Sequence, residues 1–329
     1  LVMPVDWYEQ AVELLRMHNH GQMPVLQSFQ TNGMLLDEHW CAFLRRHQAH
    51  IGVSVDGPAF LHDRHRVTRR GRGTLDQALR GIELLHEHEV PFDVITVLTS
   101  DSLDYPDELF DFYQAHGIRA VGFNVEEIEG PHTISSLQRA GTPERFRRFF
   151  ARFVQLAAAA DPPLRVREFD TSAAALLWGR CGPDARTQEN KPWAIVSVDC
   201  DGNFGTWSPE LLGQASPDHG RFALGNVATD PFDAVAASER FLRIEGQIAR
   251  GVAMCRESCT YFPFCGGGAP ANKYYENRTF ASTETLCCRL HKKVCIDVTL
   301  EFLQRQARAA GDVLHADGAA AFGAEHGTP

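Results

Sequence analysis

The chain has 329 residues, of which 44% are hydrophobic, 22% charged and 10% aromatic, the proportions of a folded soluble protein rather than a disordered or fibrous one. Its formal net charge of −10 argues against a nucleic-acid partner held by phosphate neutralisation, because such a partner requires a strongly basic surface. The longest apolar runs fall far short of the roughly 18 residues of a membrane-spanning helix, so we expect no membrane partner.

The first 130 residues alternate between short apolar runs and amphipathic stretches of helical period. The apolar runs are rich in Val, Ile and Phe and predict strands over 25–29, 51–55, 92–98 and 120–123. The amphipathic stretches predict helices over 6–18, 36–47, 74–88 and 105–116. Strands that alternate with helices are typical of βα units with a parallel sheet, so we predict an α/β fold. Four units make only an incomplete barrel, and we expect one or two further units upstream of Leu1.

Each predicted strand ends at a cluster of polar residues. The clusters are Gln30-Thr31-Asn32, Ser54-Val55-Asp56, Thr99-Ser100-Asp101, and Asn124 with Glu126 and Glu127. Polar loops also follow strands that have no function, but parallel βα units share one carboxyl edge, so we predict one active face. Ser54 and Asp56 are suited to hydrogen-bond a ribose or an amino acid, and Arg66 is suited to clamp a carboxylate.

The second half of the chain predicts a different organisation. Residues 131–190 are helical and rich in Ala, and the runs 195–198 and 204–207 flank a Gly-containing turn that predicts a β-hairpin. A final helix over about 292–309 precedes a Gly/Ala-rich end. We expect a partial barrel over 1–165, a helical linker over 166–193, a small α+β domain over 194–305 and a mobile tail over 306–329.

Nine cysteines are present, and six of them fall between residues 255 and 295. An odd number, densely clustered in a large acidic chain, favours metal or Fe–S ligation in a reducing compartment such as the cytoplasm over a disulfide scaffold. The spacing Cys255-x3-Cys259-x5-Cys265, followed by Cys287-Cys288, provides three thiolates from one loop and a fourth from a returning segment. Such a set suits zinc or a [4Fe–4S] cluster, and the spacing leaves both open.

The remaining cysteines have no partner at metal spacing. We expect Cys41 and Cys295 to lie in the core and Cys181 and Cys200 to be loop thiols.

Several of these motifs together resemble the radical S-adenosylmethionine (SAM) enzymes that carry a C-terminal SPASM-type domain. The resemblance covers residues 1 to about 305 and rests on Gln30-Thr31-Asn32-Gly33, Ser54-Val55-Asp56-Gly57-Pro58, His62-Asp63 with Arg66, Gly71 to Thr74, and the cysteine cluster. Within that family, residues 124–130, 208–211, 265–274 and 282–285 are similar to peptide maturases that build cyclophanes on Gly-rich ribosomal precursor peptides.

The sequence departs from the family pattern in two places. The Cys-x3-Cys-x2-Cys loop of the SAM cluster and the Gly-Gly-Glu-Pro strand are absent, and residues 1–4 resemble the stretch directly after that strand, so we expect an N-terminal segment to be missing. Trp207 and Ala269 stand where a second auxiliary cluster would need cysteines. The resemblance therefore implies one auxiliary [4Fe–4S] cluster, with the ligands Cys255, Cys259, Cys265 and Cys288, and with Cys287 as the alternative fourth ligand.

The resemblance also implies a reaction. In the complete protein a SAM-bound [4Fe–4S] cluster would cleave SAM to a deoxyadenosyl radical, which abstracts hydrogen from a precursor peptide and leads to a cyclophane crosslink, and the auxiliary cluster would accept an electron. The expected SAM-binding residues are Gln30, Asn32, Ser54, Asp56, Arg66 and Asn124, and the candidate proton acceptors are Glu126, Glu127 and Glu210. A reductant such as flavodoxin or ferredoxin would be a partner.

Other outcomes remain open from the sequence. The first is a radical SAM maturase that forms formylglycine or a thioether link. The second is a zinc-stapled scaffold that binds peptide without catalysis.

Overall fold

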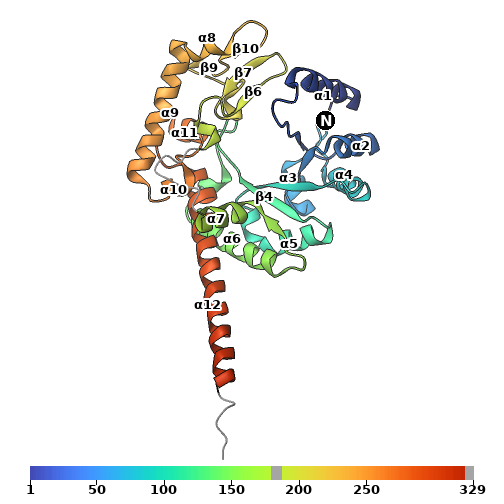
Figure 1. Cartoon of the computed structure of the whole chain (residues 1–329), viewed down its shortest axis with the longest axis vertical. Helices are drawn as coiled ribbons and strands as arrows, with labels where there is room; N and C mark the ends of the chain where they lie inside the picture. The colour runs from blue at the N-terminus through green and yellow to red at the C-terminus, as the bar shows by residue number, and fades with distance from the viewer. Residues whose placement is uncertain (179–186, 323–329) are drawn as a thin grey trace, which may run out of the picture. The chain divides into compact units, whose positions relative to one another are not determined.

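The computed structural model describes residues 1–178 and 187–322, with side chains up to residue 309, and it divides the chain into two compact units. The first unit comprises Leu1–Glu126 and Arg152–Glu168, and the second comprises Glu127–Ala151 and Phe169–Pro329. Figure 1 shows the elements of both units in chain order.

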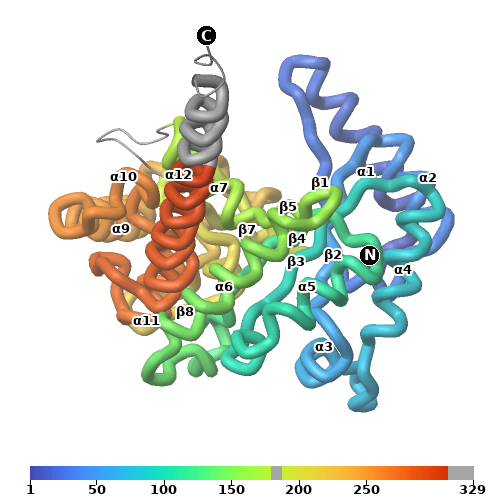
Figure 2. The backbone as a smooth tube through the Cα atoms, turned by 90° about the horizontal axis from the view of Figure 1, so that it is seen from below, coloured from blue at the N-terminus to red at the C-terminus, as the bar shows by residue number. Residues whose placement is uncertain are grey.

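The first unit is built on one parallel sheet of five strands in the order β1-β2-β3-β4-β5. Figure 2 labels all five of them. Each strand pairs in parallel with its neighbour, so all carboxyl ends lie at one edge. The strands are β1 (Ser28–Thr31), β2 (His50–Ser54), β3 (Phe92–Leu98), β4 (Ala120–Val125) and β5 (Arg165–Val166). The prediction of an α/β fold with a parallel sheet is confirmed, and the sequence periodicity missed only the two-residue β5.

Helices precede, separate and follow these strands along the chain. They are α1 (Val5–Asn19), α2 (Glu38–His47), α3 (Ala59–His65), α4 (Leu75–Glu87), the 3₁₀ turn η1 (Ser102–Asp104), α5 (Pro106–Ala115), α6 (Thr142–Ala159) and α7 (Arg167–Trp178). Leu44, Ile51 and Val94 are fully buried between sheet and helices, and Phe123 meets Phe153 edge to face at 4.8 Å. The short helix α3 was not among the predicted helices.

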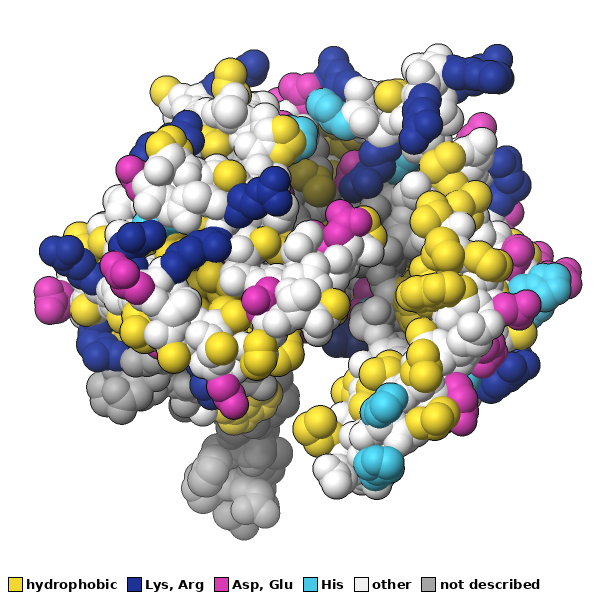
Figure 3. Space-filling model, turned by 90° about the horizontal axis from the view of Figure 1, so that it is seen from above, with side chains coloured by type: hydrophobic (Ala, Val, Ile, Leu, Met, Phe, Trp, Pro, Cys, Tyr) yellow, Lys and Arg dark blue, Asp and Glu magenta, His cyan; other side chains and the backbone are white. Residues whose placement is uncertain are grey.

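Helix α1 leaves part of its apolar surface uncovered. Its exposed hydrophobic side chains are Trp7, Leu14, Leu15 and Met17. Figure 3 shows exposed hydrophobic side chains gathered on one part of the surface of the chain.

The second unit is mainly helical with two small antiparallel sheets. Strands β6 (Val196–Val198) and β7 (Asn203–Thr206) form the predicted hairpin, and β10 (Gly225–Asn226) pairs with β7 on its other side. Strands β8 (Ala215–Ser216) and β9 (Gly220–Arg221) form the second sheet. The helical elements are η2 (Ser136–Gln138), η3 (Gln188–Asn190), η4 (Pro209–Leu211), α8 (Phe232–Ala236), α9 (Glu239–Ser258), α10 (Phe262–Cys265), α11 (Pro270–Asn277), the π-helical η5 (Cys288–Val294) and α12 (Cys295–Phe322).

The segment Glu127–Ala151 packs within the second unit. Ile128 is buried in a hydrophobic core that includes Trp207, Phe241 and Phe280. Arg147 of α6 forms ion pairs with Asp297 and Glu301 of α12. These contacts join residues that are far apart in the sequence. A prediction from local periodicity therefore placed this segment in the partial barrel over 1–165 instead.

The last helix is longer than expected. We predicted that it would end near residue 309, whereas α12 continues to Phe322, because Ala-rich sequence has high intrinsic helix propensity. Within residues 1–178 and 187–322, no helix is both long and apolar enough to cross a bilayer.

Candidate functional site

The first two strand ends of the first unit are joined by a side-chain hydrogen bond. Gln30 at the end of β1 donates from Nε2 to the hydroxyl oxygen of Ser54 at the end of β2, at 2.9 Å. Room for the Gln30 side chain exists because residue 52 between them is glycine, whose Cβ would lie 2.2 Å from Gln30 Oε1. The two predicted residues therefore occupy neighbouring positions on the carboxyl edge of the sheet.

Asp56 and Arg66 form a bidentate ion pair on the same edge. Arg66 donates from Nε to Asp56 Oδ2 at 2.6 Å and from Nη2 to Oδ1 at 3.0 Å, and Asp56 also accepts the backbone N–H of Val97 at 2.9 Å. The pair ties the end of β2 to β3. Arg66 thus has a carboxylate partner within its own chain, and a bound carboxylate would have to share its guanidinium.

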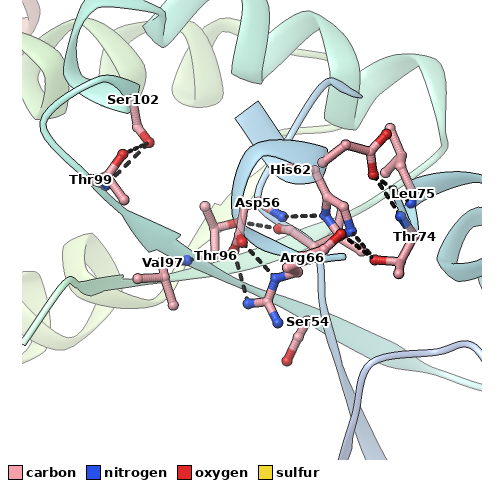
Figure 4. A network of polar contacts seen from close by, with 12 residues as sticks. Ser54, Asp56, His62, Arg66, Thr74, Leu75, Thr96, Val97, Thr99 and Ser102 are labelled. Carbon is pink, nitrogen blue, oxygen red and sulfur yellow. Dashed lines mark hydrogen bonds and ion pairs between the residues drawn. The ribbon is translucent and has the colours of Figure 1, made fainter. Parts of the chain in front are cut away.

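A buried network that sequence reasoning missed supports this pair (Figure 4). His62 is 1% exposed, and its Nδ1 accepts the backbone N–H of Asp56 at 3.1 Å. The Thr74 hydroxyl donates to the carbonyl oxygen of Arg66, so it accepts from His62 Nε2–H, and the imidazole is the neutral Nε2–H tautomer. Burial lowers the pKa of His62, in keeping with a neutral ring.

The same network caps α4 in an unexpected way. Thr74 followed by Gln77 has the sequence pattern of a capping box, but the Thr74 side chain forms no cap hydrogen bond, because its hydroxyl is used by His62 and Arg66. Asp63 supplies the cap from α3 by accepting the backbone N–H groups of Thr74 and Leu75 at 2.8 and 3.0 Å.

The end of β4 is held by residues at the start of α7. Arg167 donates from Nη2 to Asn124 Oδ1 at 2.6 Å, and Glu168 accepts both Arg167 Nε–H and the backbone N–H of Phe123. Glycine at position 122 admits the guanidinium, since a Cβ there would lie 2.8 Å from Arg167 Cζ. Asn124 is thus positioned by two residues that no sequence motif indicated.

The second unit brings four of the clustered cysteines to one pocket. It encloses about 390 Å³ of space between atoms, its solvent-open mouth included. Helix α9 contributes Cys255, the turn after it contributes Cys259, α10 contributes Cys265 and the π-helical turn contributes Cys288. Cys41 and Cys295 are buried in the core, as predicted, Cys200 is exposed, and Cys181 lies outside the described residues.

The side chains that line this pocket determine which metal centre it can hold. Among the described residues, no three His, Cys, Asp or Glu side chains lie close enough together to hold a single metal ion. A [4Fe–4S] cluster separates its four thiolates more widely than one zinc ion does. Four thiols are the donor set of both a [4Fe–4S] cluster and a tetrahedral zinc site, so the chemistry of the pocket fits either.

The electrostatics around the pocket differ from one cysteine to the next. Cys288 donates a hydrogen bond to Cys265, and this bond, with the Gly267 and Gly268 backbone N–H groups, lowers the pKa of Cys265. Burial raises the pKa of Cys255, whereas the Lys273 ammonium, 3.4 Å from its Sγ, lowers it. The net pKa shift is therefore downward for Cys265, whereas the pKa values of Cys255 and Cys288 are raised.

Cys287 turns away from its neighbour. Its thiol donates to Glu127 Oε1 at 3.1 Å, and Asn272 donates to Glu127 Oε2 at 2.7 Å. Burial, and next the Glu127 carboxylate, raise the pKa of Cys287, which keeps the thiol protonated. The adjacent cysteines therefore have different surroundings, and only Cys288 lines the four-cysteine pocket.

Acidic side chains gather near Glu127. Burial, followed by the charges of Glu127 and Glu210, raises the pKa of Glu129 to about 7, and burial raises the pKa of Glu189 with contributions from the same two carboxylates. The structure thus places Glu127 and Glu210 within one electrostatic cluster, to which it adds Glu129 and Glu189. Glu126 belongs to the first unit, where its N–H donates to the carbonyl oxygen of Leu98.

The raised pKa of Glu129 makes a pH effect on stability testable. Its folded-state pKa lies above the unfolded value, so the folded protein binds the extra proton, and stability is lost as the pH rises through about 7. We expect Glu129→Gln to reduce the fall in unfolding free energy between pH 5 and 8 by about 1–2 kcal/mol, measured by chemical denaturation. Glu239→Gln, at an exposed carboxylate of α9, is the control, and an equal effect of both variants would contradict the assignment.

Comparisons with known proteins agree with this geometry. Residues 5–113 match the Radical SAM superfamily. An uncharacterized protein of Synechocystis, sll1766, is 44% identical over 308 residues, which cover 92% of this chain and 77% of that protein. The serine-type anaerobic sulfatase-maturating enzyme of Klebsiella aerogenes is 34% identical over 130 residues, 40% of this chain and 32% of that enzyme.

Solved structures show the same fold. The anSMEcpe structure with bound AdoMet and Kp18Cys peptide matches with a TM-score of 0.71 at 19% identity, over 93% of this chain and 82% of that one. Streptococcus suis SuiB bound to S-adenosylmethionine matches with a TM-score of 0.52 at 15% identity, over 79% of this chain and 59% of that one. The α/β fold of this chain, with its parallel five-stranded sheet, thus matches the fold of these two structures. The chain belongs to the same family as sll1766, and its residues 5–113 form a domain of the Radical SAM superfamily.

Proposed function

We propose that this protein is a radical SAM peptide maturase that forms a cyclophane, a carbon–carbon bond between an aromatic ring and a side-chain carbon, in a ribosomally made precursor peptide. The observation that carries the proposal is the pocket lined by Cys255, Cys259, Cys265 and Cys288, which provides four thiols for an auxiliary cluster beside a cluster of carboxylates. A peptide substrate is supported by the sulfatase-maturating relative and by SuiB, which was solved with its precursor peptide SuiA.

In this proposal the four cysteines hold an auxiliary [4Fe–4S] cluster. SAM lies at the strand ends, held by Gln30, Asn32, Ser54, Asp56, Arg66 and Asn124. When bound, SAM and the clusters would supply homolytic SAM cleavage, hydrogen abstraction and a one-electron acceptor. The polar side chains at the strand ends of the first unit suit SAM. The thiols of the second unit, considered by itself, suit a cluster.

The protein's own residues would position SAM and would accept the proton that the peptide loses. The Ser54 hydroxyl accepts from Gln30 and keeps its own hydrogen to donate to a ribose or amino-acid oxygen. Asp56 and Arg66 hold each other in place, so that Arg66 presents its remaining N–H groups in a fixed direction. Glu127 or Glu210 would accept the proton that leaves the aromatic ring when the new bond forms, and Glu126 remains a candidate for the same task.

A second candidate is formylglycine formation, because the Klebsiella aerogenes relative is a sulfatase-maturating enzyme. Both reactions would use a reductant such as flavodoxin or ferredoxin. A reduced cluster suits a reducing compartment, so we propose a cytoplasmic location.

Peptide mass spectrometry distinguishes the candidates. The protein, in a form that contains the three-cysteine SAM-cluster loop, is incubated with SAM, a reductant and either a Gly-rich peptide with aromatic residues or a sulfatase-type Ser or Cys peptide. We expect the Gly-rich peptide to lose two hydrogen atoms per crosslink, to resist fragmentation within the ring, and to remain unreactive toward an aldehyde reagent. An aldehyde on the sulfatase-type peptide alone would favour formylglycine formation. Bound zinc without absorbance near 400 nm would contradict both.

A further inference from the structure

Lys273 is a buried cation beside the four-cysteine pocket. It lies on α11, its residue is only 4% exposed, and its Nζ donates to Cys255 Sγ at 3.4 Å. An ammonium group is costly to bury unless an anion compensates its charge. Among the described residues, no carboxylate forms an ion pair with Lys273, so the sulfur of Cys255 is the partner that the structure provides.

The fold makes room for this ammonium. Gly251 and Cys255 are four residues apart on α9 and therefore share one helix face. A Cβ at position 251 would lie 3.2 Å from Lys273 Nζ and 2.2 Å from the carbonyl oxygen of Phe280. A larger side chain at 251 would thus displace the backbone or the ammonium, and glycine leaves the Lys273 head group against the sulfur.

Lys293, a second lysine near the clustered cysteines, has different surroundings. Lys293 lies on the π-helical turn that begins at Cys288, and its side chain is 26% exposed and ion-paired with Glu284. Its positive charge is therefore already balanced by a carboxylate and partly screened by water. The charge of Lys293 acts on Cys259 and Cys288, whereas that of Lys273 acts on Cys255. Lys292 also lines the pocket and forms no ion pair with a carboxylate among the described residues, but it is only half-buried, so Lys273 is the one buried lysine of the three.

We propose that Lys273 is the fixed counter-charge of the auxiliary cluster and raises its reduction potential; this inference rests on the proposed function. Reduction adds one electron and one negative charge to the cluster without a proton from Lys273. A buried positive charge stabilises the reduced state more than the oxidised state, because attraction grows with the negative charge and is weakly screened in the interior. In the crosslinking step the electron lost by the peptide intermediate would then have a better acceptor. Lys273 acts on the cluster indirectly, through its hydrogen bond to Cys255, and is therefore a positioning residue rather than a catalytic one.

The test is a redox titration of the iron-loaded protein. Midpoint potentials are measured from the absorbance near 400 nm for the unchanged protein, Lys273→Gln and Lys293→Gln, with iron content measured in parallel. We expect Lys273→Gln to favour the oxidised cluster at least tenfold, a shift of 59 mV to lower potential for one electron, and Lys293→Gln to shift it by less than half as much. An unchanged potential in Lys273→Gln, or equal shifts in both variants, would overturn the inference.

A Lys273→Gln variant that loses its iron calls for a separate experiment. If Lys273→Gln fails to hold iron, Lys273→Arg restores the charge, and recovered iron supports the counter-charge whereas continued loss contradicts it. A wild-type protein that shows no cluster absorbance would contradict the proposed function itself, so the two failures are distinguishable.

Discussion

Replacing Cys259 with alanine is expected to remove the iron from the second unit altogether. Cys259 comes directly after the last turn of α9, where its backbone N–H donates to the carbonyl oxygen of Cys255, and its side chain lines the four-cysteine pocket. With one of four thiolates gone, the remaining three leave the proposed cluster open to solvent. Ligation and folding of short Gly-rich loops are coupled, so we also expect local unfolding around the pocket.

Iron analysis and the absorbance near 400 nm measure this effect. Cys200→Ala is the matched control, because it removes an exposed thiol outside the pocket and should keep its iron. The neighbouring pair gives a sharper comparison, since Cys288→Ala should lose iron and Cys287→Ala should retain it. Full iron content after Cys259→Ala, or about eight iron atoms bound by the unchanged chain, would show the ligand assignment to be wrong.

Replacing Gly33 with alanine should destabilise the first unit by about 2–4 kcal/mol. Gly33 ends the Gln30-Thr31-Asn32-Gly33 motif in the left-handed region, with φ of 77°. A Cβ there would lie 3.0 Å from Val53 Cγ1 and 3.3 Å from the carbonyl oxygen of Ala78. Backbone strain and a steric clash would therefore act together, and the end of β1 would have to move.

The Gly71→Ala variant distinguishes backbone strain from the steric clash. Its φ of 73° is nearly the same, but a Cβ would meet no atom within 4 Å. Gly71→Ala should cost only about 1–2 kcal/mol, the strain of a left-handed residue with a side chain. Chemical denaturation of both variants measures the difference, and equal costs would show that the close approach at Gly33 has no energetic weight.

The local pattern of the sequence was sufficient for the main architecture. Apolar runs such as 92–98 are long enough to show strand periodicity by themselves, and β3 occupies those residues. The hairpin of β6 and β7 was predicted from its turn residues, and the burial of Cys41 from its helical face. Each of these features depends on neighbours within a few positions of the chain, which a single sequence displays directly.

Other features depend on residues far apart in the sequence, and only the tertiary structure decided them. Strand β5 has two residues and exists because β4 offers it an open edge. Asp63 rather than Thr74 caps α4, because the buried imidazole of His62 occupies the Thr74 hydroxyl. Such contacts leave no periodic signal, since they join elements that the fold alone brings together.

Some features of the candidate site likewise follow from the sequence, whereas others were decided only by the tertiary structure. The sequence by itself determined which residue types are present: a polar edge that includes Ser54 and a cysteine cluster with spacing suited to a metal centre. The tertiary structure decided that Cys288 lines the pocket while Cys287 donates to Glu127, 160 positions away in the chain. It also placed Lys273 against Cys255. The physical reason is that ligation and charge compensation depend on distances through space, which spacing along the chain does not contain.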